Sequence, residues 1–291
     1  MLTLLINLES RPDRLAFMST QLDRLALPFE RIDAVDGSRA DLAPVAETLT
    51  AVEQACALSH RKAWLRFLET DHARCLILED DVILAPGLKP FLDEAGNFPD
   101  DVGALRLETR FMRTRLGPGR RCRTRGFRLH QLHSTHYGAA AYVVTRAFAE
   151  AAARDLAVFT QPVDHVLFGA ADACFYPPAA FQLRPALCVQ AELVAGVKDA
   201  SFARSDLEGP RRARLDLLEQ AVPQRRVKVK RPVSQKLWRE IARWGHKLKR
   251  MKGFAHERFV TRRAWREIPF AGPGVPAPAA PLPVPRGEQA L

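Results

Sequence analysis

The chain has 291 residues, of which 47% are hydrophobic and 26% charged, a balance typical of a soluble globular protein with a sizeable core. No apolar run approaches the roughly 20 residues that a membrane-spanning helix needs, which argues against an integral membrane protein. The net charge of +11 is uneven, because residues 209–268 contain nineteen Lys/Arg and only five Asp/Glu. The five cysteines are odd in number and form no Cys-x-x-Cys pair, so we expect reduced thiols in a cytoplasmic protein.

Strand-like and helix-like segments alternate through the first 200 residues. A short apolar run at residues 2–8 has no basic residues before it and no small-residue cleavage site after it, so we expect a strand rather than a signal peptide. Pro12 suits the first turn of a helix, and Leu15, Met18 and Leu22 follow at helical spacing. The expected strands are residues 2–8, 29–34, 76–78, 103–107 and 139–144, and the expected helices are residues 12–25, 52–69 and 146–154. This alternation predicts an α/β sheet flanked by helices, with ligands bound beyond the carboxyl ends of the strands.

The basic segment divides the chain into three expected parts. These are an α/β domain at residues 1–208, a basic amphipathic helical appendage at residues 209–268 and a proline-rich disordered tail at residues 269–291. Five apolar side chains of the appendage form one helical stripe: Leu237, Ile241, Trp244, Leu248 and Met251. A basic helix of this kind suits an anionic membrane surface, although packing of the stripe on the α/β domain is nearly as good an explanation. Nucleic-acid binding is the less favoured alternative, because the basic character avoids the α/β domain.

Three consecutive carboxylates interrupt the apolar pattern at the end of an expected strand. Glu79, Asp80 and Asp81 follow the apolar residues 76–78 and precede residues 82–84. Adjacent negative charges repel one another and resist burial, and a divalent cation with oxygen ligands, Mg²⁺ or Mn²⁺, removes that conflict. A solvated acidic turn is the alternative, and spacing alone does not separate the two.

Several segments resemble, in order and spacing, the landmarks of glycosyltransferase family 25, the lipopolysaccharide/lipooligosaccharide galactosyltransferase-like proteins. Each motif is weak alone, and one departure is Ala55, where the family more often has glycine. The resemblance covers residues 1–190 and leaves the basic appendage out. The matching segments are Ile6-Asn7-Leu8-Glu9-Ser10-Arg11-Pro12-Asp13-Arg14, residues 29–37, Glu53-Gln54-Ala55-Cys56-Ala57-Leu58-Ser59-His60, residues 78–82, residues 137–146 and residues 162–164.

The resemblance implies a GT-A-like nucleotide-sugar-binding domain with a mixed, mostly parallel sheet. It implies transfer of a hexose with inversion, commonly galactose from UDP-galactose, onto a lipid-linked glycan acceptor. The acidic cluster then takes the place of the Asp-x-Asp motif, which favours Mn²⁺ or Mg²⁺ as cofactor. A cytoplasmic protein, peripheral on the inner membrane, fits such an acceptor. A non-catalytic glycan-binding relative is the alternative in this family.

Roles for single residues follow from the chemistry of this transfer. We expect Asp81, with Glu79, to bind the metal that neutralises the departing diphosphate. Inversion needs a general base opposite the leaving group, for which Asp164 and Glu108 are the candidates, with Asp164 favoured. The remaining residues expected to hold the nucleotide sugar are Asn7, Arg11, Arg14, Ser59, His60 and Asp80, although solvated arginines and a structural histidine are the plain alternatives.

A histidine repeat and an arginine-rich segment also stand out in the sequence. His130, His133 and His136 repeat every three residues but lack a nearby acidic or cysteine partner, so we expect a loop rather than a metal site. Residues 110–128 contain eight arginines and no acids. A charge run is usually just solvated, but Gly117, Pro118 and Gly119 predict a flexible loop beside the active site, suited to clamping phosphate on the donor or on an anionic lipid-linked acceptor.

Overall fold

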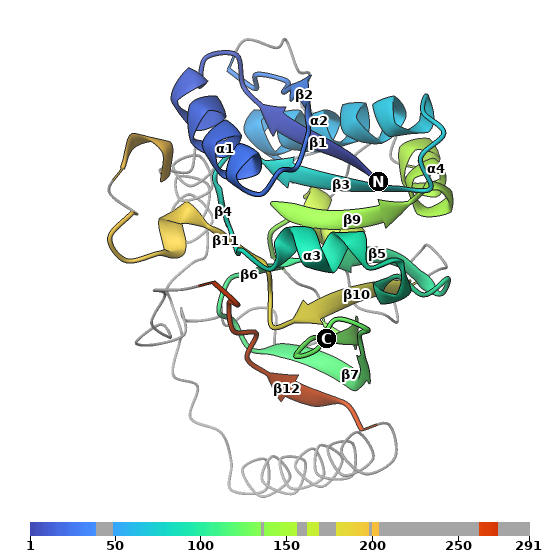
Figure 1. Cartoon of the computed structure of the whole chain (residues 1–291). Coiled ribbons are helices and arrows are strands. Elements are labelled where there is room, and N and C mark those ends of the chain that lie inside the picture. Colours follow the sequence, from blue (N-terminus) through green and yellow to red (C-terminus); the bar gives the residue numbers. More distant parts are fainter. Residues whose placement is uncertain are drawn as a thin grey trace, which may run out of the picture.

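Nine strands form one mixed sheet through the middle of the molecule (Figure 1). The computed structural model describes residues 1–38, 49–134, 137–155, 162–168, 179–197, 200–203 and 262–272. From one edge to the other, the strands are β12 (Ala264–Arg266), β7 (Thr114–Arg121), β8 (Arg128–Leu132), β10 (Ala179–Arg184), β5 (Val102–Arg106), β9 (Ala141–Thr145), β3 (Arg74–Glu79), β1 (Leu2–Asn7) and β2 (Glu30–Asp33). A second sheet contains β4 (Val82–Leu84), β11 (Cys188–Gln190) and β6 (Glu108–Thr109).

The directions of the strands confirm a mixed α/β sheet and correct one part of the expectation. β1 runs parallel to both β2 and β3, and β10 runs parallel to β5. The other five pairings of the large sheet are antiparallel, so parallel pairs are in the minority. The reason is that β9 lies antiparallel between β3 and β5, and the β7–β8 hairpin extends the far edge, which local patterns did not reveal. The parallel character predicted from the sequence therefore holds at the edge formed by β3, β1 and β2.

Helices cover both faces of the sheet. One core cluster joins Met18 and Leu22 of α1 (Pro12–Arg24) and Phe91 of α3 (Leu88–Asp93) to Leu5 of β1. A second cluster joins α2 (Ala51–Leu68), α4 (Arg146–Asp155) and α5 (Val163–Phe168) to Leu4 of β1 and neighbouring strands. Successive residues of β1 therefore face opposite layers, as the alternation of a strand requires.

Local sequence explains where the two helices beside the site begin. Pro12 occupies the first turn of α1, where its missing N–H has no intrahelical partner to lose. At the start of α2, Thr50 accepts a hydrogen bond from the N–H of Glu53, whose side chain accepts from the N–H of Thr50 in return. This reciprocal cap fixes the start of α2 next to the carboxyl ends of β1 and β2.

The arginine-rich segment is a β-hairpin rather than the expected flexible loop. Gly117 and Gly119 lie within β7, on a strand whose register shifts between Leu116 and Gly119. A Cβ added at Gly119 would lie 2.5 Å from the ring of His130, so glycine here permits close packing rather than flexibility. His130 lies in β8 and His133 directly after it, both buried, whereas His136 lies outside the described residues.

The C-terminal segment 262–272 belongs to the sheet. β12 pairs antiparallel with β7, and Phe270 forms a bridge to Ala186. Thr109 donates a hydrogen bond to the carbonyl of Ile268, whose side chain is buried. These residues therefore extend the α/β domain beyond residue 208, although they were assigned from the sequence to the appendage and the tail. The helical stripe of the appendage lies outside the described residues, and none of the helices that the structure describes is long and apolar enough to cross a bilayer.

Candidate active site

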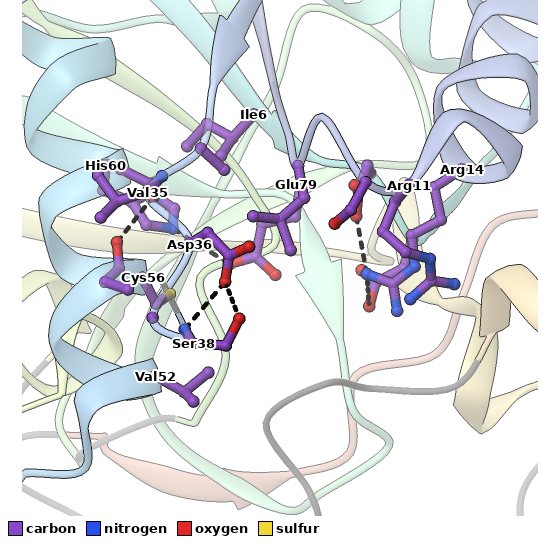
Figure 2. A pocket seen from close by; sticks show the side chains of 18 of the residues that line it. Ile6, Arg11, Arg14, Val35, Asp36, Ser38, Val52, Cys56, His60 and Glu79 are labelled. Atoms are coloured by element: carbon purple, nitrogen blue, oxygen red, sulfur yellow. Dashed lines mark hydrogen bonds and ion pairs between the residues drawn. The ribbon is translucent and has the colours of Figure 1, made fainter. Parts of the chain in front are cut away.

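A pocket of about 370 Å³ opens at the carboxyl ends of β1, β2 and β3. Its walls come from the turn after β1, the loop after β2, helix α2 and the acidic cluster after β3. Figure 2 shows Cys56 and His60 of α2 on one side, Arg11 and Arg14 on the other, and Glu79 between them. The pocket thus lies where the sequence predicted ligand binding, beyond the ends of parallel strands.

Asp80 is buried and fully engaged by neighbouring side chains. Arg14 Nη1 donates to one carboxylate oxygen at 2.9 Å, and Asn7 Nδ2 donates to the other at 2.7 Å. Burial raises the pKa of Asp80 above its ordinary value, while the charge of Arg14 and the hydrogen bond from Asn7 oppose that rise. Asp80 therefore ties β1 and α1 to the acidic cluster.

Asp81 is equally buried but differently surrounded. Its Oδ1 atom has no hydrogen-bond partner within the described residues, and the nearest cationic group, Arg14 Nη1, lies 4.0 Å from Oδ2. Burial, together with the negative charge of Glu79, raises the pKa of Asp81 well above its ordinary value. A buried carboxylate oxygen without a partner, in the wall of a pocket, fits a divalent cation, which prefers such oxygen ligands.

Glu79 is held by a histidine from the opposite wall of the pocket. His60 Nε2 lies 3.1 Å from Glu79 Oε1, and the Nδ1 atom of the same ring lies 2.8 Å from the Tyr142 hydroxyl. Glu79 retains 19% side-chain exposure, whereas the His60 side chain is 1% exposed. Glu79 therefore presents a carboxylate to the pocket, while His60 holds one of its oxygens from the α2 side of the pocket.

The other residues predicted to bind the nucleotide sugar divide into two groups. Arg11, Arg14 and Ser59 line the pocket together with His60 and Asp80. Ser59 accepts the N–H of Val35 at 2.8 Å and so fixes the loop after β2. Asn7 does not line the pocket, since its amide is occupied by Asp80, Arg31 and the carbonyl of Arg11.

The two candidate bases meet at the turn formed by residues 137–140. Glu108 accepts the N–H of Ala140 at 3.0 Å and pairs with Arg106 at 2.8 Å, and both side chains are completely buried. Burial raises the pKa of Glu108, and the charge of Arg106 opposes the rise. Asp164, the second residue of α5, accepts a hydrogen bond from the N–H of Gly138 at 2.8 Å. Neither carboxylate is among the residues that line the pocket.

Sequence reasoning missed three kinds of residue in the pocket wall. Asp36 and Ser38 form a turn after β2, joined by a 2.6 Å hydrogen bond, and the turn signal Asp36-Gly37 was visible in the sequence. Cys56 lies four residues before His60, one helical turn away, a spacing that places both on one face of α2. Gln190 reaches the site from β11, and no local pattern predicted that approach.

A pocket lined by buried carboxylates beyond the carboxyl ends of parallel strands is typical of an α/β enzyme that binds its ligand at that edge of the sheet. The family model for glycosyltransferase family 25, described as an LPS biosynthesis protein, matches residues 1–167. The chain belongs to this family and is a glycosyltransferase, as its motifs predicted.

The curated proteins that resemble this chain support the family assignment. The lacto-N-neotetraose biosynthesis glycosyltransferase LgtB of Neisseria meningitidis is 30% identical over 220 residues, which cover 69% of this chain and 78% of the relative. The lipooligosaccharide biosynthesis protein lex-1 of Haemophilus influenzae is 29% identical over 230 residues, 73% of each chain. A crystal structure of a glycosyltransferase involved in glycosylation of the major capsid of PBCV-1 matches 74% of this chain and 98% of its own, at 11% identity and a TM-score of 0.38, too distant to support further conclusions.

Proposed function

We propose that this protein transfers a hexose, galactose from UDP-galactose, with inversion onto a lipooligosaccharide or lipopolysaccharide acceptor. The observation that carries the proposal is the partnerless Oδ1 of Asp81 in the wall of a pocket at the ends of β1 and β3. Such a site suits the diphosphate of a nucleotide sugar. The names of the relatives, which concern lacto-N-neotetraose and lipooligosaccharide biosynthesis, support the acceptor class.

The cofactor in this proposal is Mn²⁺ or Mg²⁺. Asp81 would hold it together with Glu79, and the bound ion would neutralise the charge that develops on the departing diphosphate. Arg14 pairs with Asp80 beside the proposed metal ligands, and Arg11 places a second guanidinium at the pocket rim. Asp80 thus has the task of holding the cluster in place rather than contacting the sugar.

Asp164 stays the preferred general base over Glu108. The Glu108 carboxylate is enclosed completely and is committed to Arg106 and the N–H of Ala140, so an acceptor hydroxyl has no access to it. Asp164 is also buried, but it retains 4% exposure against 0% for Glu108, and it lies at the start of α5 on the other side of the same turn. We expect Asp164→Asn to lower kcat while leaving the affinity for the nucleotide sugar unchanged, because the base acts only in the transfer step.

The sheet edge opposite the pocket suits an anionic surface at the cytoplasmic side of an inner membrane. Trp265 is 52% exposed on the edge strand β12. The exposed arginines close to it are Arg113, Arg262 and Arg266, and others follow toward the far end of the β7–β8 hairpin: Arg121, Arg123, Arg125 and Arg128. Tryptophan beside several cationic side chains is typical of proteins that lie on anionic lipid, to which each cation contributes about 1 kcal/mol.

Release of UDP by the purified protein, measured for a panel of UDP-sugars with and without Mn²⁺, tests the proposed reaction. We expect metal-dependent turnover of UDP-galactose that is lost in Asp81→Ala and kept in Asp71→Ala, a matched change of an exposed acid after α2. The configuration of the transferred sugar, read by NMR, tests inversion. No turnover and no nucleotide-sugar binding by well-folded protein would refute the proposal.

Sedimentation of the full chain with vesicles tests the membrane surface. We expect binding to vesicles that contain phosphatidylglycerol, little binding to phosphatidylcholine alone, and weaker binding at high salt. Trp265→Ala should reduce the binding, whereas Leu65→Ala, which removes another exposed apolar side chain far from β12, should not. Equal binding to both kinds of vesicle would contradict an anionic surface.

A further inference from the structure

Four side chains, the last of them Glu79, form a continuous chain of hydrogen bonds. Trp64 Nε1 lies 3.0 Å from the Tyr142 hydroxyl, which lies 2.8 Å from His60 Nδ1, and His60 Nε2 lies 3.1 Å from Glu79 Oε1. Trp64 and Tyr142 are completely buried and His60 nearly so, so water does not compete for these groups. The chain begins in the core between α2 and β9 and ends at the pocket.

The chemistry of the groups fixes the direction of this chain. The indole N–H of Trp64 can only donate, so the Tyr142 oxygen accepts from it. The Tyr142 hydroxyl hydrogen then needs an acceptor, and His60 Nδ1 is the neighbour that provides one. Burial raises the pKa of Tyr142 well above its ordinary value, so this hydroxyl keeps its hydrogen. With Nδ1 accepting, the proton of neutral His60 lies on Nε2 and is donated to Glu79.

We infer that Trp64 and Tyr142 are positioning residues that act through His60 on Glu79. They hold His60 as the Nε2–H tautomer, which clamps Oε1 of Glu79 and leaves its second oxygen for the ligand in the pocket. The assignment of a role to the ligand rests on the proposed function, whereas the tautomer does not. A residue that orients a ligand-binding side chain from the second layer typically contributes a factor of about 10–100 to activity or metal affinity.

The same geometry decides between two uses of the His60 ring. Ligand atoms of Cys56, His60 and Glu79 lie within 4.8 Å of one another, a grouping that also suits a soft metal such as Zn²⁺. A metal ion on Nε2 requires that atom to be without its proton, and Tyr142 would then lose its acceptor. The hydrogen-bond chain therefore assigns His60 the part of a donor to Glu79, not of a metal ligand.

The tautomer is measured directly by ¹⁵N NMR of histidine-labelled wild-type protein, with His60 assigned by the signal lost in His60→Gln. We expect the neutral Nε2–H pattern near pH 7.5, unchanged by one equivalent of Zn²⁺, and a mixture of tautomers in Tyr142→Phe. The Nδ1–H tautomer, an imidazolium, or a Zn²⁺-shifted Nε2 signal that disappears in Cys56→Ala would overturn the inference. This measurement needs no turnover, so its failure is distinct from a failure of the proposed reaction.

Kinetics test whether the chain serves the reaction. We expect Tyr142→Phe to lower kcat/KM for the nucleotide sugar by about 10–100-fold. Phe67→Leu, which loses core packing on the same helix far from Glu79, serves as the control for reduced stability and should keep its activity. His60→Gln retains an N–H donor near the position of Nε2 and should be more active than His60→Leu. Equal activity of these two variants, or full activity of Tyr142→Phe, would contradict a positioning role.

Discussion

Replacing Asp81 by asparagine should stabilise the metal-free protein while abolishing its response to metal. In the wild type, the buried Oδ1 has no hydrogen-bond partner among the described residues, and Arg14 compensates the charge only across 4.0 Å. An unsatisfied buried polar group costs about 1–3 kcal/mol, and more when it is charged; asparagine keeps the polar atoms but removes the charge. We therefore expect Asp81→Asn to raise the free energy of unfolding by about 1–3 kcal/mol at pH 8 in the presence of a chelator.

The gain in the free energy of unfolding caused by Asp81→Asn should grow as the pH rises. Burial and Glu79 raise the pKa of Asp81 above its value in the unfolded chain, 3.8, so the folded state holds this proton more tightly than the unfolded state. The contribution of Asp81 to stability therefore falls as the pH rises from the unfolded pKa through the folded one. The advantage of Asp81→Asn over the wild type should accordingly be larger at pH 8 than at pH 5.

Thermal unfolding of both proteins at pH 5 and pH 8, with EDTA or with MnCl₂, measures these effects. A chain of this size shifts its Tm by roughly 2–4 °C for each kcal/mol, so the expected difference is resolvable. Mn²⁺ should raise the Tm of the wild type at pH 8 and leave that of Asp81→Asn unchanged. A variant less stable than the wild type at pH 8, or one with the same response to Mn²⁺, would refute the assignment of Asp81 as the metal ligand.

Three further changes test the support of the site. Glu108→Ala leaves Arg106 buried without its partner and should cost about 3–5 kcal/mol in urea unfolding, and a loss below 1 kcal/mol would contradict a buried ion pair. Gly138→Ala should lower both stability and kcat, because φ is +93° and the new Cβ would lie 2.7 Å from Glu108 Oε1; normal activity would show that the turn adapts. Thr50→Ala removes the cap of α2 and should cost about 1 kcal/mol with unchanged KM, so a large rise in KM would mean that the cap also shapes the pocket.

The edge of the sheet that carries the pocket was predictable because its signals are local. β1, α1, β2 and α2 follow one another along the chain, each with its own periodicity or cap, and the parallel pairing of β1 with β2 follows from the helix between them. The other half of the sheet depends on strand pairings between segments that are far apart in the sequence. β10 enters between β5 and β8, and β12 joins β7 from about 150 residues away, so no local pattern indicates where these strands belong.

The candidate site shows the same division between local and distant determinants. Asn7, Arg14 and Asp80 were predicted as separate ligand contacts, and the structure joins them in one hydrogen-bonded group. Glu108 and Asp164 were predicted as competing bases, and the structure shows in addition that both support the turn at residues 137–140. The residue types were sufficient to indicate a polar site, but the partners that decide each role lie up to about 70 residues apart.

Asp80 and Asp81 show why adjacent identical residues acquire different roles. The alternation of an extended chain predicts that Asp81 faces the same way as Glu79 and that Asp80 faces the opposite way. The chain turns at Asp80 and Asp81 instead, so all three carboxylates line the pocket, and Arg14 and Asn7 satisfy both oxygens of Asp80. Asp81 shares the field of Glu79 and keeps one oxygen without a partner, so its folded state is strained until a cation arrives. The side chain that the fold leaves unsatisfied is the one with free energy available for binding, and on that ground we propose Asp81 as the metal ligand.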